Sequence, residues 1–205
     1  MDPALVLFGQ SLLIGLSIAA PVGQIGVLAI QRTLQLGPAA GLATGLGAAV
    51  ADALYGAIGA FGITVLIGWL VDHRSAFALV GSVVLLWMAW RIARQPPATR
   101  RAGDDRPAAL LGLFAGTFVL TLSNPTTILS FLAVFGAIAG RTAQASPWLM
   151  VGGVLVGSAL WWLFLAAAVG RLRSRFDARW QRRVNLASAA LLAGFAFWQI
   201  AGLLR

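Results

Sequence analysis

The chain contains no cysteine, no lysine and no glutamate, and its only histidine is His73. Without cysteine it can form no disulfide, no thiolate metal site and no cysteine nucleophile. One histidine and six scattered aspartates leave little for a hydrolytic triad or a multi-histidine metal centre. We therefore expect neither an enzyme nor a protein that holds a metal ion or another cofactor.

Charged residues are also scarce: they make up 10% of the chain, whereas hydrophobic residues make up 60%. A soluble domain has about 25% charged and about 45–50% apolar residues, so this composition predicts an integral membrane protein. The net charge is +9, but the arginines lie in short spacers between apolar runs and not on a polar, solvated face. Nucleic acid is therefore not an expected partner.

Six apolar runs are candidates for membrane-crossing helices, which need about 20 mainly apolar residues. They cover residues 5–30, 39–71, 76–90, 108–139, 147–169 and 184–204. The first run has no basic segment before it and no clean small-residue cleavage site after it, so we expect it to be retained and not removed as a signal peptide. The sequence predicts an all-α integral membrane protein with six transmembrane helices.

The arginines are distributed unevenly over the connections between these runs. Twelve of the fifteen lie in the first, third and fifth connections, and basic residues collect on the cytoplasmic side of a membrane. We therefore expect a multi-pass protein of the cytoplasmic (inner) membrane with both termini outside the cytoplasm. The basic stretch 171–183 is expected to contact the anionic lipids of the inner leaflet, with a role in gating as the alternative.

The chain divides into two similar halves around a polar, proline-rich segment. Residues 1–93 form the first half, 94–107 a cytoplasmic linker, and 108–205 the second half. Pro21 and Pro125 interrupt apolar runs 104 residues apart, and Asp52 and Ser158 follow them 106 residues apart. Three helices per half place the second copy in the opposite orientation, and such inverted repeats with broken helices are typical of secondary transporters.

The fourth predicted helix is broken at Asn124-Pro125. Asparagine is a favoured helix N-cap, proline suits the first helical position, and the hydroxyls of Thr126 and Thr127 follow in the first turn. The start of a half-helix at this point would suit a substrate carboxylate, which interacts well with exposed amides and the positive end of the dipole. A proline kink packed against a neighbouring helix is the alternative interpretation.

The first predicted helix carries the matching break at Pro21, because proline removes a backbone donor and clashes with the preceding turn. Gly23 and Gly26 allow the backbone to approach closely, and Gln24 between them is a buried amide. Such breaks are tolerated in a membrane where the backbone lines a cavity or is paired by neighbours. Glycines used only for helix packing are the alternative here.

Asp52 is the only ionisable residue well inside an apolar run, and Tyr55 shares its helix face. A carboxylate at bilayer depth is costly and is a functional candidate, which here would balance a substrate ammonium or exchange protons during transport. A structural, hydrogen-bonded aspartate is the alternative. The expected polar wall of a site near the midplane comprises Asp52, Tyr55, Gln24, Asn124, Ser123, Thr126 and Thr127, with Ser158, Trp161 and Trp162 as candidate cavity lining.

Taken together, these motifs resemble those of the LysE-type amino acid exporters of the lysine exporter superfamily. The similarity lies in residues 20–26, in Arg32-Thr33 and the glycines of 41–47, in residues 51–56, and in residues 121–131. Gln24 departs from this pattern, which often has a second proline there. The resemblance implies proton-driven export of amino acids or close derivatives, with amino acid, protons, lipids and a further copy of the chain as partners. A cation or metal exporter of the same superfamily and a non-transporting membrane scaffold are the alternatives.

Overall fold

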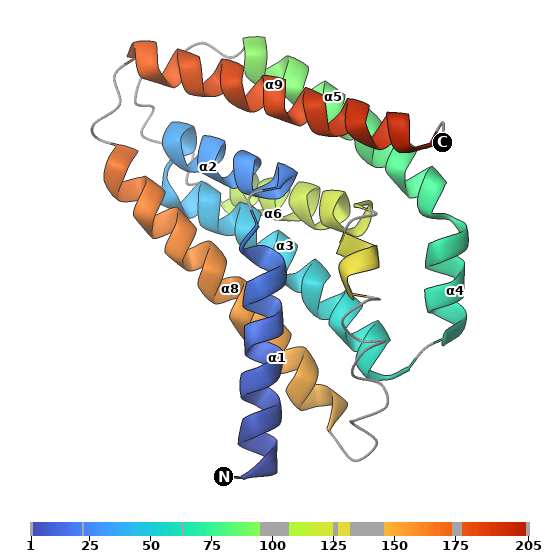
Figure 1. The fold of residues 1–205 in the computed structure, drawn as a ribbon. Coiled ribbons are helices and arrows are strands. Elements are labelled where there is room, and N and C mark those ends of the chain that lie inside the picture. Colours follow the sequence, from blue (N-terminus) through green and yellow to red (C-terminus); the bar gives the residue numbers. More distant parts are fainter. Residues whose placement is uncertain are drawn as a thin grey trace.

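The structure is a computed structural model that describes residues 2–21, 23–62, 64–94, 107–124, 127–131, 146–173 and 178–203. All regular structure in these ranges is helical (Figure 1), as predicted. The helices are α1 (Pro3–Ala19), α2 (Gln24–Leu36), α3 (Pro38–Ala60), α4 (Thr64–Asp72), α5 (Arg74–Arg94), α6 (Pro107–Leu122), α8 (Pro147–Leu172) and α9 (Ala178–Leu203). A short helical segment also covers residues 127–131.

Four of these helices, α3, α5, α8 and α9, are long and apolar enough to cross a membrane, and the bent pair α1 and α2 would make a fifth span. The protein is therefore a multi-pass membrane protein with four or five candidate spans among the described residues, and the sixth predicted span lies partly outside these residues. The difference lies in the predicted run 108–139. Its first part, α6, has only 16 residues, and the structure describes the run no further than Phe131.

The second predicted run, 39–71, is wrong as a single helix. Helix α3 ends at Ala60, where the amide of Phe61 donates to the carbonyl of Ala57 and that of Gly62 to the carbonyl of Gly59. Gly62 has a φ of 63°, a left-handed conformation that cannot continue an α-helix and that glycine adopts without a steric penalty. The chain then turns into the separate nine-residue helix α4.

The break at Pro21 separates α1 from α2, and the axes of these two helices differ by 78°. Helix α1 begins at Pro3, where Asp2 Oδ1 accepts a hydrogen bond of 3.0 Å from the amide of Ala4. Because proline at position 21 has no amide hydrogen to donate, the helical ladder cannot continue through it. Helix α2 restarts three residues later at Gln24.

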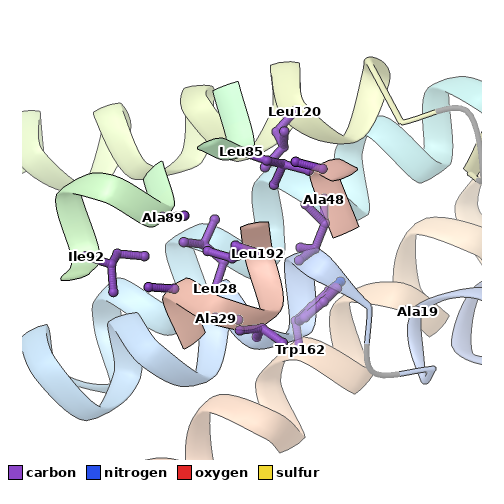
Figure 2. Close-up of a cluster of buried hydrophobic side chains, with 14 of the residues drawn as sticks. Ala19, Leu28, Ala29, Ala48, Leu85, Ala89, Ile92, Leu120, Trp162 and Leu192 are labelled. Atoms are coloured by element: carbon purple, nitrogen blue, oxygen red, sulfur yellow. The ribbon is translucent and has the colours of Figure 1, made fainter. Parts of the chain in front are cut away.

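The helices form two groups: α1, α2, α3, α6 and α8 cross one another, and the pair α5 and α9 covers them on one side. Helix α3 packs against α8 and α6, and α1 packs against α8, whereas α5 and α9 run side by side over α2 (Figure 1). The larger apolar cluster lies between these groups, where Leu28, Leu85, Leu120 and Leu192 are all almost fully buried (Figure 2). This packing brings residues from both halves of the chain to the centre of the molecule.

Arg173, at the end of α8, holds the end of α2. Its Nε donates to the carbonyl of Leu34 at 3.0 Å, and its Nη2 donates to the carbonyl of Gln35 at 2.8 Å. The last carbonyls of a helix lack intrahelical donors, so the charged side chain of Arg173 satisfies two of them.

Arg173→Ala is expected to lower the free energy of unfolding by about 1.5–3 kcal/mol, the value of hydrogen bonds to a charged group. Thermal unfolding of the purified protein in detergent measures this loss. Arg171→Ala is the matched control, since among the described residues Arg171 bonds only to the carbonyl of Ala167 in its own helix. Equal unfolding temperatures for the two variants would show that the contact between α8 and α2 does not stabilise the fold.

Candidate functional site

A cavity of about 170 Å³ lies between the bend of α1 and α2, the middle of α3, the end of α6 and the middle of α8. Both halves of the chain therefore contribute to its wall. The polar residues that line it are Gln24, Asp52, Thr121, Asn124, Thr127 and Ser130, and the apolar ones include Ile18, Ala19, Ile25, Ala48 and Trp162.

Asp52 of α3 is bonded to Ser158 of α8. Asp52 as a whole is 4% exposed, and its Oδ2 accepts a hydrogen bond of 2.8 Å from Ser158 Oγ. Ser158 Oγ in turn accepts one of 3.2 Å from Trp162 Nε1. Among the described residues Asp52 has no other hydrogen bond and no arginine within ion-pair distance. Asp52 therefore lines the cavity with one carboxyl oxygen, Oδ2, held by Ser158 and with no hydrogen bond to Oδ1 among the described residues.

Gln24 connects the cavity to the α5 and α9 pair. It is the first residue of α2 and is buried, and its Oε1 accepts a hydrogen bond of 3.4 Å from Gln199 Nε2. Gln199 Oε1 accepts one of 3.1 Å from Ser82 Oγ. The three buried side chains make a polar link from the cavity wall through α9 to α5.

The second break follows the end of α6. Tyr55 donates its hydroxyl hydrogen to the carbonyl of Leu122 at 2.6 Å, which satisfies a carbonyl that the ended helix leaves free. The amide of Ile128 donates to the carbonyl of Asn124 at 3.2 Å, the bond that begins a new helical turn. Asn124 thus stands at the start of the 127–131 segment.

The remaining predicted residues near this break lie differently. Thr127 lines the cavity. Ser123 is buried and donates to the carbonyl of Val119 at 2.9 Å, and, like Tyr55, it lies beside the cavity and not in its wall. Pro125 and Thr126 lie outside the described residues.

At the first break, Pro21, Gly23 and Gly26 all line the cavity. The amide of Gly23 donates to the carbonyl of Pro21 at 2.8 Å, and a Cβ added at Gly23 would meet nothing within 4 Å. The backbone at this point is therefore next to open space.

Of the two adjacent tryptophans, Trp162 lines the cavity and Trp161 does not. Trp162 packs directly on α3: a Cβ added at Gly45 would lie 2.3 Å from Trp162 Cβ. Thr121 and Ser130 also line the cavity, although the sequence interpretation did not select them. Both follow from the same motif, since they lie within three to six residues of Asn124.

Arg32 is placed differently from the sequence interpretation, which assigned it to the first connection and found no arginine inside a span. It lies within α2, whose helix continues to Leu36. Its Nη1 donates to Thr44 Oγ1 at 3.0 Å, to Thr117 Oγ1 at 2.9 Å and to the carbonyl of Leu113 at 3.4 Å. The predicted run stopped at Ile30 because polar residues follow, but those residues continue the helix.

Comparison with known proteins agrees with this architecture. The chain is 31% identical to the "Uncharacterized membrane protein YahN" of Escherichia coli K12, over 82% of this chain and 77% of that protein. It is 27% identical to the "Putative amino acid efflux protein YcgF" of Bacillus subtilis, over 94% of both chains. It is 26% identical to the "Chemotactic transduction protein ChpE" of Pseudomonas aeruginosa, over 97% of this chain and all of that protein. No solved structure matches the chain.

Residues 16–201 match the family described as LysE type translocator. The match covers nearly the whole chain, and it includes both helix breaks and every described residue of the cavity wall. The family consists of transporters and not of enzymes. The chain belongs to the LysE type translocator family.

Proposed function

We propose that the protein is a secondary active exporter of amino acids or close derivatives across the cytoplasmic membrane. The observation that carries this proposal is the cavity whose wall combines the buried Asp52, which has no arginine partner among the described residues, with the amides of Gln24 and Asn124 and the hydroxyl of Thr127. A carboxylate opposite amides and a helix start can hold the two ends of a zwitterion.

The cavity has room for a small molecule. Its 170 Å³ corresponds to the volume of about five or six waters at about 30 Å³ each. In this proposal Asp52 balances the ammonium, Asn124 and the segment that follows it hold the carboxylate, and Gln24 and Thr127 complete the polar wall. Tyr55 and Ser123 support the end of α6, and Pro125 and Thr126 belong to the same break.

Proton coupling is the second part of the proposal. A carboxyl that alternates between binding a proton and binding an ammonium makes the two ligands exclusive, which is the requirement for antiport. Asp52 can do this because Ser158 Oγ fixes only one of its oxygens. The YcgF protein, named for amino acid efflux, supports an amino acid as the substrate.

Two inverted three-helix repeats, residues 1–93 and 108–205 joined by the linker 94–107, are the third part. A Cβ added at Gly47 would lie 2.3 Å from the carbonyl oxygen of Phe114, and one at Gly153 would lie 2.7 Å from that of Phe8. Gly47 and Gly153 are 106 residues apart, and so are Phe8 and Phe114. The bonded pair Asp52 and Ser158 has the same spacing. The same packing contact thus occurs twice, once with the halves exchanged, and this repetition supports the inverted repeat.

A cation exporter is the competing function. The described part of the chain contains no group of three or more histidine, cysteine, aspartate or glutamate side chains that could hold a metal ion. No specific observation favours this alternative, and the transport assay includes it as one arm.

Efflux from proteoliposomes tests the proposal. Vesicles containing the purified protein are loaded with one labelled solute from a panel of amino acids and divalent cations, and a proton gradient is imposed. We expect efflux of at least one amino acid that depends on the protein and on the gradient. Gradient-dependent efflux of a divalent cation but of no amino acid would contradict the proposal.

The proposed orientation gives a separate prediction. Residue 104 in the linker lies outside the described residues, and the arginine distribution predicts a cytoplasmic position for it. Because the chain has no cysteine, Asp104→Cys provides a single labelling position. We expect a membrane-impermeant maleimide to leave it unlabelled in intact cells and to label it after lysis. Labelling in intact cells would reverse the orientation and place both termini in the cytoplasm.

A further inference from the structure

A second and larger cavity, of about 430 Å³, lies between α2, α5 and α6. Arg32, Arg91 and the amides of Gln31 and Gln35 line it, and no aspartate is among its lining residues. On the α6 side the wall includes Gly112, where an added Cβ would meet nothing within 4 Å. The cavity is therefore roomy and positively charged, unlike the first, whose only charged lining residue is Asp52.

Arg32 supplies a charge without a counter-ion. Among the described residues its hydrogen bonds are all donated by Nη1 and all end on neutral oxygens, those of Thr44, Thr117 and Leu113. Nε and Nη2 have no hydrogen-bond partner among the described residues. A guanidinium within a candidate membrane span, here the bent pair of α1 and α2, is costly, and a bound anion offsets that cost.

Arg91 adds a second charge from the facing helix. Its guanidinium lies 4.9 Å from the centroid of the Trp87 ring, and both residues line the cavity. Stacking on the ring fixes the guanidinium while leaving its edge free for hydrogen bonds. Two guanidinium groups from α2 and α5 thus reach one space, which is the arrangement that binds an oxyanion.

The two cavities lie along the same helix. Gln24 and Gly26 of α2 line the first, and Gln31 and Arg32 line the second, which is a step of about 10 Å at 1.5 Å per residue. The apolar cluster of Figure 2 contributes to both walls, with Ala48 and Trp162 at the first cavity and Leu28 at the second.

We propose that this second cavity is an additional substrate site, in which Arg32 and Arg91 bind the carboxylate of the amino acid on the arginine-rich side of the membrane before it passes along α2 to Asp52. This inference rests on the proposed function. The carboxylate of the substrate is favoured over a lipid phosphate because Gln35 is buried, because α3 and α6 hold Arg32, and because α2 lines both cavities.

Binding is tested first without transport, by iodide quenching of Trp87 fluorescence in phosphatidylcholine vesicles, taken as the difference from Trp87→Phe. We expect acetate, added at constant ionic strength, to displace iodide from the cavity and so to reduce the quenching of Trp87. We expect Arg91→Gln to raise the iodide concentration needed for half-maximal quenching about tenfold. Hydrogen bonds to charged groups contribute that much to affinity or more. Arg94→Gln is the matched control: Arg94 stacks on Trp90 at 4.6 Å but does not line the cavity.

Quenching that neither acetate nor Arg91→Gln changes would overturn the proposal. Displacement of iodide by phosphatidylglycerol in the vesicles, with no effect of acetate, would also overturn it and identify a lipid site. Arg32 also joins α2 to α3 and α6, so replacing it can destabilise the fold. Arg32→Gln is therefore used only if its unfolding temperature matches that of Arg32→Lys, which keeps the charge. Arg91 is exposed at the end of α5, so its variant is expected to fold.

The transport arm uses the amino acid that the efflux panel identifies. Arg91→Gln should raise the half-saturation concentration about tenfold when the substrate is presented on the linker side, and not when it is presented on the other side. Equal effects on both sides, or none, would overturn the proposal. If no amino acid is exported at all, the proposed function fails, and the acetate arm still decides whether the cavity binds a carboxylate.

Discussion

Asp52→Asn is expected to abolish gradient-driven export while the protein remains folded in the membrane. The asparagine keeps the size of the side chain and can still accept the hydrogen bond from Ser158 Oγ, which is 2.8 Å from Asp52 Oδ2. It removes the charge that would balance a substrate ammonium and the group that would exchange a proton. Efflux per folded molecule, measured beside wild-type protein in the same vesicles, gives the result.

Stability separates this reading from a structural role of Asp52. Because no arginine pairs with Asp52 among the described residues, neutralising it should leave the unfolding temperature unchanged or raise it. Breaking a buried ion pair would instead cost about 3–5 kcal/mol. Asp72→Asn is the matched control, since Asp72 is exposed at the end of α4. We expect this variant to transport normally. An Asp52→Asn protein that is unstable yet exports normally per folded molecule would contradict the proposed role of Asp52 in binding the substrate or a proton.

Gly157→Ala is expected to destabilise the protein strongly. Helix α8 packs so closely on α1 that a Cβ at Gly157 would lie 2.0 Å from the carbonyl oxygen of Leu12 and 3.0 Å from the amide nitrogen of Leu16. Both are backbone atoms, so no side chain can move aside and the helices must separate. Small residues at such positions let membrane helices approach closely.

Overpacking of this kind costs about 1–3 kcal/mol, occasionally more. For a chain of this size each kcal/mol lowers the unfolding temperature by about 2–4 °C. Gly112→Ala is the matched control, because a Cβ there would meet nothing within 4 Å. Thermal unfolding of both variants in the same detergent compares them, and equal temperatures would mean that α1 and α8 are not held as the structure has them.

The all-α class, the interruption at Pro21 and the segment that starts at Asn124 were accessible from sequence because proline and asparagine act locally on the backbone. Asp52 was accessible because an ionisable residue in an apolar run is rare. Its contact with Ser158 was not predicted, although the equal spacing in the two halves marked both positions. Local chemistry was therefore enough to select most of the cavity wall.

Features that depend on how helices pack were not accessible in this way. Trp161 and Trp162 are equivalent in sequence, and only the fit of Trp162 against Gly45 decides which of them faces the cavity. Arg32 was assigned to a connection because its charge ended the apolar run, whereas acceptors on α3 and α6 hold it within α2. No motif marks Gln199, which reaches Gln24 only through the packing of α9 on α2.

Protection of a single cysteine tests most directly whether the transported amino acid occupies the cavity at Asp52. The chain has no cysteine, so Ser130→Cys places one thiol in the wall and Ser75→Cys places one at an exposed position on α5. We expect a saturating concentration of the exported amino acid to slow methanethiosulfonate labelling of Ser130→Cys and to leave that of Ser75→Cys unchanged. An unchanged labelling rate at Ser130→Cys, in a variant that still exports, would contradict the location of the substrate site.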